Sequence, residues 1–346
     1  MRKAELIGFQ KFEIKEVPDP KPEKEEVIIK VNFCAICGTD LEPLRTLKEK
    51  GLDATYIQIS MDLWNKVAGI YLYQTIGHEI SGEITQIGEE VKNWNIGDKV
   101  VPRAYGGYAD LVKASVKSKG LYGGLYKVPE NVSMEEAAFS EPLAVAIAAV
   151  RRSEMKLGDK IAIFGAGPIG LLTLQCAKIA GASEIIVSEP MKLRREFAKK
   201  FGANNVINPL EEDPVEKIKE LTNDEGVDVA FECSGNSEAL KQAIDVARIG
   251  APQYHIRGKV VIVGIHIRPA TIYPNYIVLK NVELKGTIAY EPYGTPNDEF
   301  KIALKLLQHK KVDVKSMITG KFPLEKINEA FQEVLEGKHV KALIHP

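Results

Sequence analysis

The sequence predicts an α/β protein with two domains, an all-β, barrel-like domain and a domain built on a doubly wound parallel sheet. Short strand-like segments separated by Gly and Pro fill roughly the first 140 residues, whereas strands and helices alternate strictly afterwards. The length of 346 residues, at roughly 100–200 residues per domain, is enough for two hydrophobic cores.

The composition excludes several classes of partner. The 46 lysine and arginine residues balance 47 aspartate and glutamate residues. The net charge therefore gives no strong electrostatic attraction to nucleic acid or to an anionic membrane. No apolar run approaches the roughly 18 residues of a membrane span, and the start MRKAELIGFQ lacks the apolar segment of a signal peptide. We therefore expect a cytoplasmic protein that binds neither nucleic acid nor a membrane.

The boundary between the domains is expected just after Pro142. There the run LAVAIAAVRRS is helical, and strand–helix alternation begins. The helices after TPNDEF and the last strand, VKALI, are expected to return to the first domain. We assign residues 1–142 and 291–346 to the first domain and 143–290 to the second. The strands expected before the boundary are residues 3–9, 12–17, 25–33, 79–88, 97–103 and 106–115.

The second domain reads as six strands joined by helical crossovers, which implies a doubly wound parallel sheet. The expected strands are residues 161–164, 184–188, 205–208, 227–233, 259–264 and 282–289, and the expected helices are 168–180, 192–201, 214–221 and 237–247.

The motif GAGPIG has glycines at the three positions of G-x-G-x-x-G, and it follows the buried strand IAIF and opens a helix. Gly165 would form the tight turn, Gly167 would admit a pyrophosphate to the backbone, and Gly170 would let the helix pack on the strand. The alternative is a glycine turn that binds no nucleotide. The motif as a whole predicts dinucleotide contacts at Gly165, Gly167, Pro168, Ile169 and Gly170.

Glu189, in IIVSEP, is the acidic residue expected at the end of the second strand of such a domain. It should hold the ribose hydroxyls and repel the 2′-phosphate of NADP, which favours NAD. Arg194 and Arg195 argue for the alternative, NADP, because an arginine near this strand end can accept a 2′-phosphate.

The segment CAICGTD allows three interpretations. A structural zinc clip of four thiolates needs two close pairs, and Cys176 and Cys233 are isolated residues in the other domain. A thioredoxin-like redox pair starts a helix in a βαβ unit, whereas Cys34 and Cys37 follow EEVIIKVNF, a strand with the alternating pattern typical of an antiparallel sheet. The remaining interpretation is that one cysteine is a ligand in a mixed site.

His78 and Glu79 in TIGHEISG could complete such a site. Either residue alone is uninformative, because a lone His is more often a packing residue and a lone Glu is usually solvated. With one cysteine they supply a thiolate, an imidazole and a carboxylate, which suits zinc with an open, catalytic position. Glu141 in FSEPLAV is a further candidate, and its alternative role is a charge at a helix N-terminus.

CGTD, GHE-x-x-G-x-I-x-x-I-G, GDKVV, EPL and GAGPIG follow one another in this order along nearly the whole chain. This arrangement resembles the zinc-dependent medium-chain dehydrogenases, especially the branch of sorbitol and threonine dehydrogenases. The resemblance implies a GroES-like β-rich catalytic domain plus a Rossmann domain. It also implies one catalytic zinc, NAD, and a homo-oligomer, a dimer or homotetramer, to which VELKGTIA would offer a sheet edge.

The resemblance further implies residue roles. Cys37, His78, Glu79 and Glu141 would bind or approach the zinc, and Thr39 would hydrogen-bond the reacting oxygen. Cys34 would then be a packing residue that does not bind the zinc.

Three departures from the family are visible. The segment GDKVVPRAYGGYADL has no four-cysteine lobe, so we expect no structural zinc. Residues 42–74 are a longer connection than usual, interpreted as an altered lid, a subunit contact or a surface insertion. Glu42 stands where relatives commonly have a histidine, which leaves the substrate and the proton route open.

The resulting hypothesis is an NAD-dependent zinc dehydrogenase of a secondary alcohol, either a polyol or a sugar-derived substrate. The alternative is an L-threonine 3-dehydrogenase, which the likeness of SEPMKLRREFAKKFGA to that enzyme favours. A non-catalytic nucleotide-binding relative and a zinc-free quinone reductase are disfavoured, because the chain retains the ligand set.

Overall fold

The computed structural model describes residues 1–8, 11–41, 76–117, 122–250, 257–266, 269–287, 290, 293–295 and 298–346. The chain forms two compact units, one made of Met1–Ala144 and Tyr290–Pro346 and the other of Val145–Ala289. Within the described ranges, no helix has the length and apolar character needed to cross a membrane.

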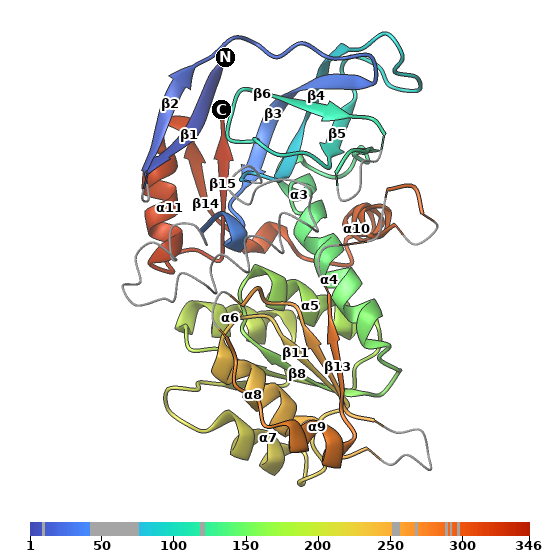
Figure 1. Ribbon diagram of the computed structural model, residues 1–346, viewed down its shortest axis with the longest axis vertical. Coiled ribbons are helices and arrows are strands. Elements are labelled where there is room, and N and C mark those ends of the chain that lie inside the picture. Colours follow the sequence, from blue (N-terminus) through green and yellow to red (C-terminus); the bar gives the residue numbers. More distant parts are fainter. Residues whose placement is uncertain are drawn as a thin grey trace. The chain divides into compact units, whose positions relative to one another are not determined.

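The first unit is built on a seven-stranded sheet with the order β14-β15-β3-β4-β5-β7, in which β6 also pairs with β3. In Figure 1 the red C-terminal strand β15 lies between β14 and the blue β3. A separate two-stranded sheet pairs β1 with β2. The strands are β1 (Arg2–Gly8), β2 (Lys11–Glu16), β3 (Glu26–Ala35), β4 (Glu79–Ile87), β5 (Lys99–Pro102), β6 (Leu111–Ser115), β7 (Leu125–Lys127), β14 (Ile318–Pro323) and β15 (Lys341–His345).

The register of this sheet positions the ends of three strands. β3 pairs antiparallel with β4, where Ala35 lies opposite Glu79, and with β15, where Ala35 lies opposite Leu343. Apolar side chains of β3 and β4, such as Ile29 and Ile80, are fully buried in the core of the unit. Strand pairing therefore brings the end of β3 close to the start of β4 and to β15.

Short helices complete the first unit. The Ser133 hydroxyl accepts a hydrogen bond from the Glu136 backbone N–H, and the Glu136 carboxylate accepts one in return from the Ser133 N–H, which caps α3. The helical segments are α3 (Met134–Ala137), the first turn of α4 (Ser140–Ser153), α10 (Glu299–Gln308), η3 (Lys315–Met317), η4 (Leu324–Lys326) and α11 (Ile327–Leu335).

The second unit has a parallel six-stranded sheet with the order β10-β9-β8-β11-β12-β13. The strand order reverses between β8 and β11, the place where a doubly wound sheet opens a crevice at its carboxyl ends. The strands are β8 (Lys160–Phe164), β9 (Glu184–Ser188), β10 (Asn205–Ile207), β11 (Val229–Glu232), β12 (Lys259–Ile262) and β13 (Glu283–Gly286). The helices are α5 (Pro168–Ile179), α6 (Lys192–Phe201), α7 (Pro214–Leu221), α8 (Ser237–Val246) and α9 (Pro274–Lys280).

A β-rich unit and a doubly wound parallel sheet are the α/β architecture that the sequence predicts, and that fold class is confirmed. The predicted sixth strand is shorter than expected, since β13 ends at Gly286.

Candidate metal and nucleotide sites

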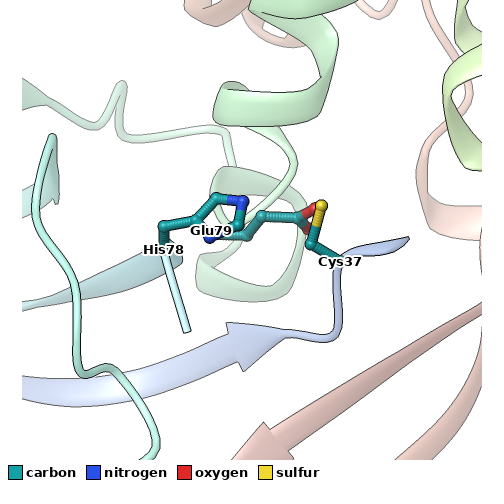
Figure 2. A group of neighbouring side chains, drawn as sticks. All are labelled: Cys37, His78 and Glu79. Carbon is teal, nitrogen blue, oxygen red and sulfur yellow. The ribbon is translucent and has the colours of Figure 1, made fainter. Parts of the chain in front are cut away.

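Three potential metal ligands converge in the first unit. The Cys37 sulfur, a His78 ring nitrogen and a Glu79 carboxylate oxygen all lie within 4.8 Å of one another. Figure 2 shows the Glu79 carboxylate beside the Cys37 sulfur, with the His78 ring next to them. Cys37 comes just after β3, and Glu79 is the first residue of β4. The pairing of these two strands thus brings together ligands that are distant in the sequence.

The buried carboxylate of Asp40 holds the backbone around this group. Its Oδ2 accepts hydrogen bonds from the Cys37 backbone N–H at 3.0 Å and from the Tyr108 hydroxyl at 2.6 Å. Its Oδ1 accepts one from the Gly77 backbone N–H at 3.1 Å and lies 3.7 Å from His78 Nδ1. At 3.7 Å the Asp40–His78 contact is an electrostatic one rather than a hydrogen bond. Asp40 therefore hydrogen-bonds to the backbone of both segments that carry the ligands, at Cys37 and at Gly77, which precedes His78.

Cys37 and His78 influence each other electrostatically. Burial raises the pKa of the Cys37 thiol above its ordinary value, although His78 opposes the shift. Burial lowers the pKa of His78, but Cys37 and the Asp40 carboxylate outweigh that effect and hold it well above its ordinary value. A metal that binds both groups must displace their protons. A thiolate, an imidazole and a carboxylate form a donor set that fits zinc.

Glu79 is also paired with a buried cation. Lys341 Nζ, on β15, lies 2.6 Å from Glu79 Oε1 and 2.5 Å from Oε2, and both side chains are at most 2% exposed. Burial lowers the pKa of Lys341, but Glu79 and Cys37 outweigh it, so the pKa rises above its ordinary value. Lys341 is therefore charged and compensates the Glu79 carboxylate.

The other predicted residues of this site lie around the ligand group. Glu141, in the first turn of α4, is not one of the three grouped ligands, but its charge helps to raise the pKa of His78. Burial raises the pKa of Glu141 itself to about 7. Thr39 Oγ1 is buried and has no hydrogen-bond partner within the described part of the chain. Cys34 is fully buried and also lies outside the group.

The predicted glycine loop joins β8 to α5 in the second unit. Gly165 has a φ of +93°, which side chains disfavour. A Cβ added to Gly170 would come within 1.9 Å of the Gly165 carbonyl oxygen, so only glycine lets the helix start this close to the strand. Gly167 is the N-cap of α5, and Pro168 and Ile169 are its first residues. The open backbone N–H groups there suit a pyrophosphate.

A carboxylate and a guanidinium flank this loop. Glu189, 2% exposed, accepts hydrogen bonds from the Ala166 backbone N–H at 2.7 Å and from the Met191 backbone N–H at 2.9 Å. A Cβ added to Gly167 would lie 3.9 Å from Arg194 Nη1. The fold thus brings the predicted acidic residue and the predicted arginine to the loop, and Glu189 also supports the loop backbone.

Some predicted features lie outside the described residues, namely Glu42 and the segment 42–74. Two residues that the sequence reasoning missed lie at the site, Asp40 and Lys341. Asp40 was visible as the last letter of CGTD, and Lys341 as a lysine in the otherwise apolar strand VKALI. A lysine there signals a buried partner, because buried charges are normally paired.

Two family models match the chain. Residues 23–137 match an alcohol dehydrogenase GroES-like domain, and residues 168–309 match a zinc-binding dehydrogenase.

The chain is 36% identical over 369 residues to (R,R)-butanediol dehydrogenase of Bacillus subtilis, covering 100% of both. It is 30% identical to sorbitol dehydrogenase of Bacillus subtilis, covering 100% of this chain and 97% of that one. It is 32% identical to L-threonine 3-dehydrogenase of Thermococcus kodakarensis, covering 96% and 94%. The crystal structure of 2R,3R-butanediol dehydrogenase from Bacillus subtilis superposes with a TM-score of 0.80 at 33% identity, covering 100% of this chain and 99% of that one.

Proposed function

The chain belongs to the zinc-dependent medium-chain dehydrogenases, and we propose that it oxidises a secondary alcohol, a polyol or a sugar-derived one, by hydride transfer to NAD. The observation that carries this proposal is the convergence of Cys37, His78 and Glu79 in a chain that also has the GAGPIG loop. The glutamate-rich site resembles the polyol branch more than the ethanol-type branch, whose third zinc ligand is a cysteine. The butanediol and sorbitol dehydrogenases among the relatives support the same class.

We assign Cys37, His78 and Glu79 as the ligands of a single zinc ion per chain, with Glu141 beside them. Three protein donors leave a catalytic zinc one open position. When bound, zinc acts as a Lewis acid that lowers the pKa of an alcohol hydroxyl. No second, structural zinc is proposed, because the chain lacks the cysteines for one.

The residues around the ligands have distinct tasks in this proposal. Thr39 Oγ1, buried and without a partner in the described ranges, is suited to hydrogen-bond the substrate hydroxyl and to act as the first proton relay, accepting the substrate proton while its own hydroxyl proton passes on toward solvent. Asp40 orients the His78 ring and the Cys37 backbone. Lys341 holds the Glu79 carboxylate in place and balances its charge.

The dinucleotide is proposed to be NAD rather than NADP. Glu189 places a buried negative charge beside the glycine loop, where it would repel a 2′-phosphate. Arg194 lies near Gly167, so it is suited to the pyrophosphate. The units of residues 1–144 with 290–346 and of 145–289 would serve as catalytic and nucleotide-binding domains, respectively.

L-Threonine is the second candidate substrate. The 32% identity to an L-threonine 3-dehydrogenase and the likeness of SEPMKLRREFAKKFGA favour it. Glu42, which stands where relatives commonly have a histidine, argues against L-threonine as the substrate.

Assembly into a dimer or tetramer is proposed through the free edge of the six-stranded sheet. β13 is the terminal strand of that sheet, and it follows α9 in the chain. Near this strand Tyr273, Val278 and Leu279 are 61%, 70% and 76% exposed. Large exposed apolar side chains that cluster on one element are typical of an interface.

The test is NADH formation by the zinc-loaded protein with polyols, sugar acids and L-threonine, at one saturating NAD concentration. A strong preference for a polyol or sugar acid supports the leading proposal. A clear preference for L-threonine replaces it with the second candidate.

A further inference from the structure

Two tyrosines extend the candidate zinc site into an aromatic wall. The Tyr105 ring packs edge-on against the His78 imidazole, with 6.0 Å between the ring centroids. The Tyr122 ring lies 4.2 Å from the Tyr105 ring. Tyr105 and Tyr122, called the tyrosine wall below, therefore form a continuous surface that begins at a proposed zinc ligand. All of these residues belong to the first unit.

The hydroxyl of Tyr122 is buried and has no hydrogen-bond partner among the residues that the structure describes. Burial raises the pKa of Tyr122 to about 12, so the phenol is neutral and able to donate. The charge of Arg103 opposes this rise in the pKa of Tyr122, and the charge of Glu141 adds to it.

Two buried tyrosines of the same unit have hydrogen-bond partners for their hydroxyls. Tyr108 donates to Asp40 at 2.6 Å, and Tyr126 donates to Asp298 at 2.9 Å. A buried hydroxyl without a partner forfeits a hydrogen bond that water would supply in the unfolded chain. The Tyr122 hydroxyl is thus suited to a partner that arrives with a ligand.

We propose that the Tyr122 hydroxyl donates a hydrogen bond to a second oxygen of the substrate, so that the site selects diols and polyols over alcohols with a single hydroxyl. This inference rests on the proposed dehydrogenase function and deepens it. The zinc ligands and Thr39 would act on the oxygen that is oxidised, and Tyr122 on the second oxygen.

Selectivity follows from the cost of leaving the hydroxyl unpaired. A diol satisfies Tyr122, whereas a mono-alcohol of the same carbon skeleton buries it without a partner. A site with a polar group built for a substrate hydroxyl discriminates against the analogue that lacks that hydroxyl. The expected preference is about tenfold to a hundredfold in kcat/KM.

The test compares 2,3-butanediol with 2-butanol as substrates of the zinc-loaded enzyme with NAD. The variant Tyr122→Phe keeps the ring and removes only the hydroxyl. Its kcat/KM for 2,3-butanediol should fall about tenfold to a hundredfold, whereas its kcat/KM for 2-butanol should stay the same or rise, because this variant has no hydroxyl that the mono-alcohol leaves unpaired. Tyr126→Phe is the matched control, because its hydroxyl is already bonded to Asp298. The diol-to-alcohol ratio of this control should stay at the wild-type value.

An equal loss with both alcohols, or no loss with either, would overturn the assignment of Tyr122 while the proposed function stands. A wild-type enzyme that forms NADH from neither alcohol, nor from any polyol, would overturn the proposed function and this inference together. Retained thermal stability of Tyr122→Phe shows that a change in kcat/KM does not come from unfolding.

Discussion

Lys341 Nζ lies 2.6 Å from Glu79 Oε1, although the two residues are 262 positions apart in the chain. The sheet order explains this contact, because β15 and β4 both pair with β3. The pair keeps the Glu79 carboxylate beside Cys37 and His78 while compensating its charge in a fully buried setting. The last strand of the chain is therefore part of the candidate zinc site.

Replacing Lys341 by Met should lower the free energy of unfolding by about 3–5 kcal/mol, because it leaves the Glu79 carboxylate buried without a cation. Urea denaturation of the metal-free protein measures the change. The control is Lys321→Met, since Lys321 is half exposed where it pairs with Glu135, and its loss should cost less than about 1 kcal/mol. Equal losses in the two variants would contradict the role assigned to the buried pair.

Cys37→Ser should abolish stoichiometric zinc binding, because a hydroxyl is a far weaker zinc donor than a thiolate. The measurement is metal content by plasma mass spectrometry after dialysis against trace zinc. Cys34→Ala is the matched control: the Cys34 side chain is buried outside the ligand group, so this variant should keep its zinc. Zinc retained in Cys37→Ser but lost in Cys34→Ala would reverse the assignment of the two cysteines.

Glu189→Ser should reduce the preference for NAD over NADP by about tenfold or more, because it removes a buried negative charge at the glycine loop. The KM for NAD should rise too, since the hydrogen bond to the Ala166 backbone is lost. Ratios of kcat/KM for the two cofactors measure the effect. Glu184→Gln, at the opposite end of β9, should leave the ratio unchanged. A ratio that is unaltered in Glu189→Ser would argue against this source of cofactor choice.

Leu279→Lys should dissociate the proposed oligomer, because a charge would enter the apolar patch on α9. Light scattering coupled to size-exclusion chromatography measures the mass. Leu157 is 88% exposed and lies elsewhere in the second unit, so Leu157→Lys should keep the wild-type mass. A wild-type mass for Leu279→Lys would exclude this patch from the interface.

The parts of the molecule that local patterns encode were predictable from the sequence. The strand IAIF, the glycines and the following helix are contiguous, so the glycine loop could be recognised from one segment, and the alternation of six strands with helices predicted the doubly wound sheet. CGTD and GHE likewise indicated Cys37, His78 and Glu79 as ligand candidates.

Long-range partners were not predictable in the same way. The pairing of Lys341 with Glu79 depends on the order of strands in a sheet, which no motif states. The tyrosine wall depends on loops after β5 and before β7 that meet only in the folded unit. Periodicity indicates which face of an element is buried, but not which distant side chain lies opposite it.

The central claim is that this chain is a zinc-dependent alcohol dehydrogenase whose metal is held by Cys37. The most direct test measures NADH formation from a polyol by the wild type and by Cys37→Ser, first after chelation and then after zinc is added back. The account predicts activity that chelation abolishes and zinc restores in the wild type, and no restoration in Cys37→Ser. NADH formation that survives chelation, or that zinc restores equally in Cys37→Ser, would contradict it.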